Sequence, residues 1–111
     1  MSYAIVNPEE VEAHHGVFRR LSGPLGVTAF AVNQISIGPN TEGRAHDHTA
    51  DGQEEVYVFT HGSGTLAVDG QEVPVTAGQW AFVSPESRRQ LTAGDEGLTW
   101  IGIGAASGAG A

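Results

Sequence analysis

Two histidines separated by a single residue, His46 and His48, are the side chains whose types and spacing most directly indicate chemistry. On an extended strand, residues two apart point to the same face, so both imidazoles can reach one point a few ångströms from a sheet. Neutral imidazole is the commonest nitrogen ligand that proteins offer to metal ions. The pair therefore predicts half of a metal site, although by itself it is equally compatible with two surface histidines.

A carboxylate from the next strand would complete such a site. Glu54 and Glu55 begin that strand, which is predicted over Glu54–Thr60. Alternation places Glu55 on one face with Tyr57 and Phe59, and places Glu54 on the other. Parity alone does not decide which glutamate points inward, and an acidic pair at a strand end can also be simply solvated. Two histidines and one carboxylate would leave coordination positions open, which suits Fe(II) and similar divalent ions.

The rest of the chain supplies short β-rich segments that can position these residues. β-branched and aromatic residues fill the stretches between turn signals, of which Asp69-Gly70 is the strongest hairpin signal. The predicted strands are Val27–Ile37, Arg44–His48, Glu54–Thr60, Thr65–Val68, Glu72–Val75, Gln79–Val83, Gln90–Thr92 and Leu98–Ile103. So many short strands in 111 residues predict one all-β domain, a sandwich or a barrel.

One helix is predicted near the N-terminus. Asn7 can cap it, Pro8 suits its first position, and Glu10 lies three residues after the cap. The helix is expected to run from about Pro8 to His14. His14 and His15 would then stand at its C-terminal end, where a cation suits the helix dipole, and we interpret them as structural.

Charge and composition argue against several classes of function. The chain has 13 acidic and 5 basic residues, all of the latter arginine, for a net charge of −8. Nucleic acids and anionic membranes are therefore poor partners. The absence of cysteine excludes disulfides, thiol catalysis and cysteine-type zinc sites. No apolar run approaches the ~18 residues of a spanning helix, and residues 1–10 lack the order of a signal peptide, so we expect a cytoplasmic protein.

Residues 37–64, IGPNTEGRAHDHTADGQEEVYVFTHGSG, resemble the first motif of the cupin family. That motif reads glycine, five residues, His-x-His, three or four residues, glutamate, six residues, glycine. Asn40 stands where the first glycine is expected, and asparagine tolerates the left-handed conformation well. The spacing to Gly62 implies Glu55, rather than Glu54, as the carboxylate ligand.

The first motif departs from the family pattern at one place. Six residues separate His48 from Glu55, which is about two more than the family has. We interpret the difference as a longer hairpin loop through Asp51 and Gly52.

The second cupin motif is degraded. Gly78 matches it, but Arg89 stands where the fourth family ligand, a histidine, is expected. A guanidinium cannot bind a cation. Arg89 can instead bind an anionic substrate group through its fork of donors, pair with Glu55 in place of a metal, or lie solvated beside Arg88. His61 shares the parity of Glu55 and is either an alternative ligand or a turn residue at the barrel mouth.

The resemblance implies a double-stranded β-helix, that is, a jelly-roll barrel with a short N-terminal helix. It implies a divalent ion (Fe, Mn, Ni, Co, Zn or Cu) held by His46, His48 and Glu55. A small organic ligand would lie nearby, and its candidate binding residues are Tyr57, Phe59, Trp80 and Arg89. Oxygenation, isomerisation and cyclisation all occur on this scaffold. The alternatives are a non-catalytic binding or sensor module without essential metal, and a metal-free enzyme in which Glu55 or a histidine is the general base.

The resemblance also suggests how the chain is organised. Residues 1–21 would form an N-terminal segment that packs on the barrel or on a partner, residues 22–104 the barrel, and residues 105–111 a flexible tail. Small cupins usually dimerise, often by exchanging an edge or N-terminal strand, so we expect a homodimer.

Overall fold

The computed structural model describes residues 2–108, which form mainly antiparallel β-structure. In chain order the elements are the 3-10 turn η1 (Pro8–Glu10), β1 (Ala13–His14), β2 (Phe18–Arg20), α1 (Ser22–Leu25), β3 (Ala31–Ile37), β4 (Gln53–Val68), β5 (Gln71–Thr76), β6 (Trp80–Val83) and β7 (Arg89–Ala106). The predicted all-β class is confirmed, and helix is limited to η1 and α1 within the described residues.

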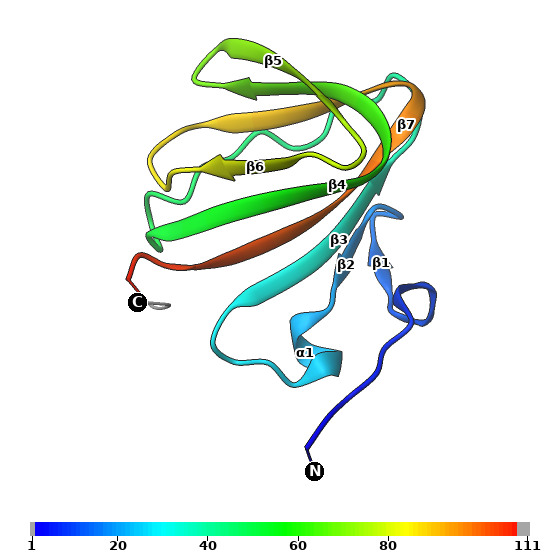
Figure 1. The fold of residues 1–111 in the computed structure, drawn as a ribbon, viewed down its shortest axis with the longest axis vertical. Helices are drawn as coiled ribbons and strands as arrows, with labels where there is room; N and C mark the ends of the chain where they lie inside the picture. The colour runs from blue at the N-terminus through cyan, green and yellow to red at the C-terminus, as the bar shows by residue number, and fades with distance from the viewer. Residues whose placement is uncertain (1, 109–111) are drawn as a thin grey trace.

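The long strands β4 and β7 organise the fold. The first half of β4 pairs with β6 and with the second half of β7, whereas its second half pairs with β5 and with the first half of β7. Both strands curve, so that their two halves belong to two facing layers (Figure 1). Strands β3, β2 and β1 extend the layer formed by the second half of β7.

The strand β4 crosses between the layers at a β-bulge that requires glycine. Register shifts occur between Phe59 and His61 and between Gly62 and Gly64. A Cβ on Gly62 would collide with the carbonyl group of Gly97, and Gly62 also has a φ of 79°. The turn predicted to end the strand at this point is therefore absent, and β4 continues through it to Val68.

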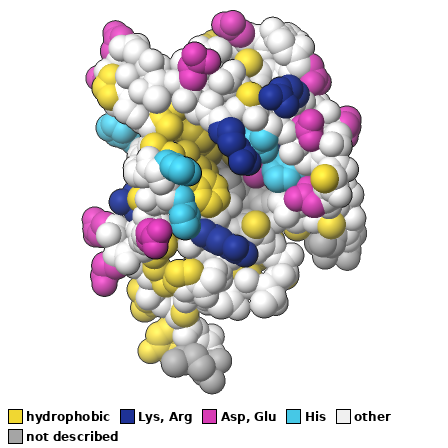
Figure 2. Space-filling view, turned by 180° about the vertical axis from the view of Figure 1, so that it is seen from behind, with side chains coloured by type: hydrophobic (Ala, Val, Ile, Leu, Met, Phe, Trp, Pro, Cys, Tyr) yellow, Lys and Arg dark blue, Asp and Glu magenta, His cyan; other side chains and the backbone are white. Residues whose placement is uncertain are grey.

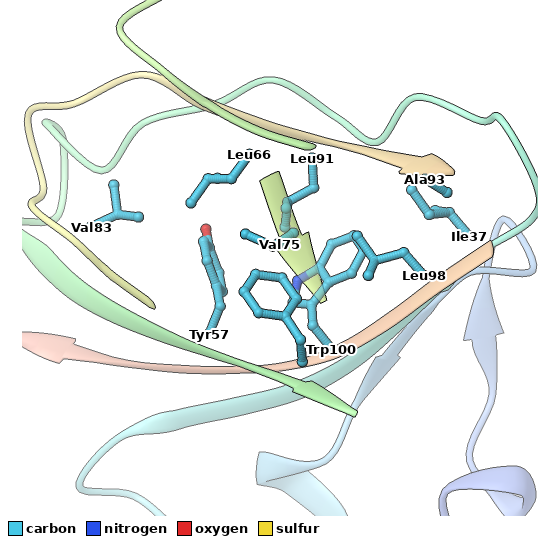
Figure 3. Packing of buried hydrophobic residues seen from close by; sticks show 10 residues of the cluster. Ile37, Tyr57, Leu66, Val75, Val83, Leu91, Ala93, Leu98 and Trp100 are labelled. Carbon is cyan, nitrogen blue, oxygen red and sulfur yellow. The ribbon is translucent and has the colours of Figure 1, made fainter. Parts of the chain in front are cut away.

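The hydrophobic core lies between the two layers (Figure 3). It is built from inward-facing residues of β3 to β7, namely Ile37, Tyr57, Phe59, Leu66, Val75, Val83, Leu91, Ala93, Leu98 and Trp100. The β4–β5 hairpin turns at Asp69-Gly70, where both residues have positive φ, as the sequence predicted. Alternation along each strand thus places one set of side chains in the core.

The N-terminal segment differs from its prediction. The helix expected up to His14 is limited to η1, and Asn7 makes no capping hydrogen bond to the backbone. Ala13 and His14 instead form β1, which pairs with β2 across a turn in which His15 and Gly16 have positive φ. Because β2 pairs in turn with β3, the segment is joined to the main sheet rather than merely packed on it.

Two further segments also differ from their predictions. Residues 44–48 form no strand and are joined to the rest by the isolated bridge between His46 and Arg89. Strand β7 is continuous over both segments predicted at its place, and it includes residues 105 and 106 of the predicted tail. Residues 109–111 of that tail lie outside the described part.

The outer side of the sheet carries an exposed apolar surface. Register places six side chains in two neighbouring rows across β6, β4 and β7: Val56, Val58, Trp80, Phe82, Ile101 and Ile103. Of these, Trp80 is 70% and Phe82 61% exposed. We call this set the outer apolar face. None of the six side chains carries a charge. No helix among residues 2–108 is both long enough and apolar enough to span a membrane.

Candidate metal centre

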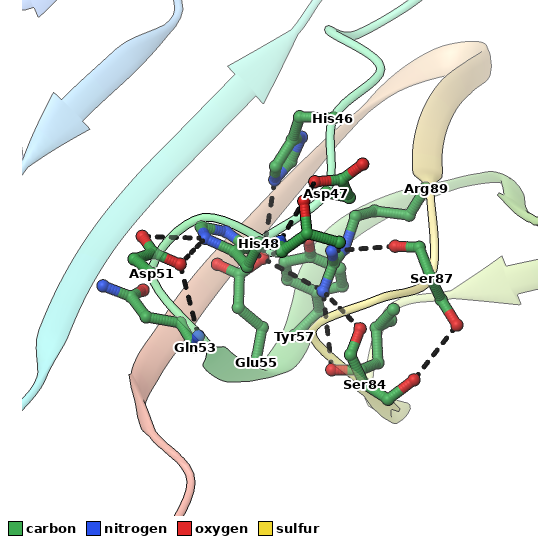
Figure 4. Close-up of polar contacts among 12 residues, drawn as sticks. His46, Asp47, His48, Asp51, Gln53, Glu55, Tyr57, Ser84, Ser87 and Arg89 are labelled. Carbon is green, nitrogen blue, oxygen red and sulfur yellow. Dashed lines mark hydrogen bonds and ion pairs between the residues drawn. The ribbon is translucent and has the colours of Figure 1, made fainter.

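Three potential ligands converge beneath one edge of the barrel. One side-chain atom each from His46, His48 and Glu55 lies within 4.8 Å of the other two. The Nε2 atom of His46 lies 3.5 Å, and that of His48 3.2 Å, from the same oxygen, Glu55 Oε1. Figure 4 shows both imidazoles and the carboxylate directed toward one another.

Backbone hydrogen bonds hold the two histidines beside the start of β7. His46 and Arg89 exchange N–H···O bonds of 3.0 and 2.8 Å, and the His48 amide donates to the Pro85 carbonyl at 2.8 Å. The segment is therefore extended although it is not a regular strand. This extension places residues two apart on one side, as the spacing predicted.

Glu55 is the inward-facing glutamate. It is 9% exposed and lies on the same face as Tyr57, whereas Glu54 is exposed on the other face. Space for its side chain comes from β7, because a Cβ on Gly104 would lie 3.3 Å from Glu55 Cγ and 2.7 Å from Gln53 Oε1. The cupin motif thus implied the glutamate that faces inward, where parity alone did not decide.

The hydrogen bonds of the imidazoles direct their Nε2 lone pairs into the site. His48 Nδ1 lies 3.0 Å from Asp51 Oδ1, and His46 Nδ1 lies 3.3 Å from the Arg44 carbonyl oxygen. Both oxygens can only accept, so both Nδ1 atoms donate. A neutral imidazole then presents an unprotonated Nε2, and two such atoms face one carboxylate oxygen. Three electron-pair donors around one point are an arrangement that a bound cation stabilises.

The loop between His48 and Glu55 also orients the His48 imidazole. It contains Asp51, which receives the hydrogen bond from His48 and another from the Gln53 amide at 3.2 Å. Desolvation would raise the pKa of Asp51, but these contacts outweigh it and lower that pKa. The two extra residues that depart from the cupin spacing thus lie in a segment that orients a ligand.

Arg89 is a buried cation behind the carboxylate. It is 1% exposed, and its NH2 atom lies 3.7 Å from Glu55 Oε1. Its NH1 donates to the Ser87 carbonyl at 2.9 Å, while NH2 also lies 3.4 Å from the carbonyls of Val83 and Ser84. The Nε–H has no hydrogen-bond partner among the described residues. Of the three roles open to Arg89 from the sequence, a solvated loop residue is excluded.

The surroundings hold Glu55 in its charged form and Tyr57 in its neutral form. Burial alone would raise the pKa of Glu55. In the metal-free protein a hydrogen bond from a protonated His46 ring, the Tyr57 hydroxyl at 2.7 Å, and the positive charges of a protonated His48 ring and of Arg89 together lower it. Burial and the negative charge of Glu55 raise the pKa of Tyr57 far above its ordinary value. Tyr57 is therefore a fixed donor to the carboxylate and cannot serve as a base near neutral pH.

A cavity of about 440 Å³ adjoins the three potential ligands. Its wall is mostly apolar and includes Val17, Ile35, Ile37, Leu91 and Trp100. Figure 2 shows, on the side opposite that of Figure 1, a hollow with an apolar floor bordered by histidine and arginine side chains. The volume is in the range of pockets that bind small organic molecules.

The structure brings two of the four predicted ligand-binding residues to this cavity. Tyr57 and Arg89 line it, whereas Phe59 is buried in the core and Trp80 belongs to the outer apolar face. Both of the latter lie outside the cavity wall. His61 is exposed at the bulge of β4 and is likewise not part of the wall.

Two histidines of the cavity wall were not among the predicted site residues. His14 and His15 line the cavity, because the β1–β2 hairpin, and not a helix, carries them. The signal that could have revealed them is His15-Gly16 between short β-rich segments, which is compatible with a hairpin turn.

Comparison with known proteins supports the fold. No protein-family model matches the chain, and no curated protein does. A cupin protein from Bacteroides fragilis has a similar structure, with a TM-score of 0.84 and 22% identity over 97% of this chain and 87% of its own. A Cupin 2 conserved barrel domain protein from Salinispora arenicola has a TM-score of 0.76 and 20% identity over 98% of this chain and 92% of its own.

The chain has the cupin fold. A cupin-superfamily sugar phosphate isomerase from Silicibacter pomeroyi is also similar, with a TM-score of 0.67 and 23% identity over 81% of this chain and 59% of its own. At such identities the likeness extends to the fold alone. The jelly-roll architecture expected from the sequence is thereby confirmed, and the group formed by His46, His48 and Glu55 could bind a metal ion.

Proposed function

We propose that this cupin holds one divalent metal ion with His46, His48 and Glu55 and binds a small organic molecule in the adjoining cavity. The observation that carries the proposal is the convergence of two imidazole Nε2 atoms on one carboxylate oxygen, with both Nδ1 atoms committed to acceptors. Two nitrogen donors and one carboxylate match the facial arrangement that leaves open positions on Fe(II) and related ions.

The residues around the ligands support such a site. Asp51 fixes the orientation of His48 by accepting a hydrogen bond from its Nδ1, as outer carboxylates commonly do in metal sites. Tyr57 orients Glu55 through its hydroxyl. When bound, the ion would act as a Lewis acid or as a centre for oxygen chemistry. The apolar wall excludes water from part of the cavity and would orient the carbon skeleton of a ligand.

A metal-free binding module is the second candidate, and Arg89 favours it. A guanidinium 3.7 Å from Glu55 Oε1 already compensates the carboxylate charge without any metal. In that case the cavity binds its ligand with the ion pair intact. A structural neighbour with this fold is named a sugar phosphate isomerase, which supports a small molecule as the ligand.

Metal content separates the two candidates. The protein is loaded with Co²⁺, Zn²⁺, Mn²⁺ or Fe²⁺, passed through a desalting column, and analysed for metals beside a His46→Ala/His48→Ala variant. We expect about one ion per chain in the wild type and loss of the ion in the double variant. His61→Ala, which removes an exposed histidine outside the cavity, should retain the metal. The absence of stoichiometric metal from the wild type with every ion tested would contradict the first candidate.

A further inference from the structure

The charges that line the cavity are unusual for this protein. The chain has 13 acidic and 5 basic residues, yet within residues 2–108 the cavity wall includes two arginines, Arg44 and Arg89, and a single acid, Glu55. Arg44 is exposed at the wall, and Arg89 is buried. A strongly acidic molecule thus directs two of its few cations to one apolar hollow.

The single acid is already shared among several partners. Glu55 Oε1 receives the Tyr57 hydroxyl hydrogen bond and lies near both histidines and Arg89. A divalent ion held by the same carboxylate would leave the centre with two net positive charges once Arg89 is included. Positive charge in a largely buried site is costly unless an anion accompanies it.

Arg89 also retains donor capacity. A guanidinium has five N–H donors, and Nε of Arg89 is fully buried without a partner. Buried polar groups are nearly always hydrogen-bonded, so this unpaired N–H leaves the buried Arg89 guanidinium incompletely compensated.

From these observations we infer that the cavity binds a small organic anion with an apolar body. Its oxyanion group, a carboxylate or a phosphate ester, would lie among Arg44, Arg89 and the metal centre. Its carbon skeleton would contact the apolar wall around Ile35, Leu91 and Trp100. The inference rests on the proposed function for the contribution of the metal, whereas the two arginines act with or without it.

The test compares acids with neutral molecules of the same shape. Butanoate, hexanoate and phenylacetate are each titrated into metal-loaded and metal-free protein by calorimetry, beside their primary amides. Phenyl phosphate is titrated in the same way and distinguishes a site for a phosphate ester from a site for a carboxylate. In the loaded protein we expect at least one acid to bind about tenfold or more tightly than its amide, the worth of one charge-assisted hydrogen bond. If no acid in the series binds more tightly than its amide, the inference is wrong.

Variants separate the arginines from the metal. Arg44→Gln, at an exposed position, should reduce the acid-to-amide preference about threefold, and Arg89→Gln should reduce it further. Arg88→Gln is the matched control, because Arg88 is exposed and lies outside the cavity wall. An unchanged preference in both cavity variants would assign the anion to the metal alone and overturn the role of the arginines.

The two failures remain distinguishable. If the wild type binds no metal but prefers acids in a manner that depends on Arg44, the proposed function fails and the inference stands. If metal binds stoichiometrically but acids and amides bind equally, the inference fails and the proposed function stands.

Discussion

Replacing Arg89 by glutamine should affect the metal-free and the metal-loaded protein in opposite directions. The guanidinium NH2 lies 3.7 Å from Glu55 Oε1, and Arg89 is 1% exposed. At an effective dielectric constant of about 20, two unit charges at that distance attract by about 4 kcal/mol. Removing one partner of a buried pair commonly costs about 3–5 kcal/mol, because the other charge stays buried.

We therefore expect Arg89→Gln to destabilise the metal-free protein by about 3 kcal/mol. For a domain of this size that loss lowers Tm by roughly 10 °C. The variant should nevertheless bind a divalent ion at least about tenfold more tightly than the wild type, since the ion no longer competes with a buried cation for the carboxylate. Saturating metal should then raise Tm more in the variant than in the wild type.

Differential scanning calorimetry after chelator treatment, with and without added Co²⁺ or Zn²⁺, measures both effects. Arg88→Gln serves as the control, because this exposed neighbour loses the same charge and should change stability by no more than about 0.5 kcal/mol. The reasoning is refuted if metal-free Arg89→Gln is as stable as the wild type. It is equally refuted if the substitution weakens metal binding.

Three other perturbations test separate parts of the structure. Asp51→Asn should weaken metal binding about tenfold, because His48 loses the carboxylate that orients it; unchanged affinity by calorimetry would contradict this role. The pKa of Glu55 is lowered in the folded protein, so its contribution to the stability of the metal-free protein is present above about pH 4.3 and is lost as the pH falls through the folded value. Urea unfolding between pH 3 and 6 should therefore show a steeper loss in the wild type than in Glu55→Gln, and equal slopes would refute the assignment. Two copies that each carry a net charge of −8 can approach most easily through the uncharged outer apolar face, so we expect a homodimer. The Trp80→Ser/Phe82→Ser variant should be a monomer. A monomer mass for the wild type in light scattering would exclude the dimer.

Local sequence patterns predicted where β-segments occur better than they predicted which segments join into one continuous strand. Asp69-Gly70 predicted a hairpin correctly, because the turn requires positive φ at both residues and these two residue types adopt it irrespective of distant contacts. The sequence predicted two strands, Glu54–Thr60 and Thr65–Val68, whereas Gly62 allows a single strand β4 to pass close to the Gly97 backbone. That close approach is a tertiary contact between distant segments, and no local pattern indicates it. Similarly, the cap signals around Pro8 predicted a helix, but pairing of β1 with β2 ends it after one turn.

The sequence predicted the three potential ligands of the candidate site, but it predicted only part of the cavity around them. The spacing of the two histidines, with the cupin resemblance, led to the three residues that the structure brings together. Alternation could not distinguish which aromatic residues line a cavity, because it assigns faces and not depths. Phe59 shares the inward face with Tyr57 but lies in the core. Trp80 lies on the opposite face, on the outside of β6. The burial of Arg89 depends on the path of the chain from Ser84 to Ser87, whose carbonyls accept its hydrogen bonds.

The buried guanidinium also couples the two proposed ligands to each other. In the metal-free protein Arg89 has Glu55 as its counter-ion. A metal ion that draws on the same carboxylate leaves Arg89 in need of another negative partner, and an oxyanion in the cavity supplies it. Metal should therefore increase the affinity for the anion, and by thermodynamic linkage the anion must increase the affinity for metal by the same factor. A histidine at this position would add a ligand but would not create this coupling, so we expect the arginine to make metal binding depend on the molecule bound beside it.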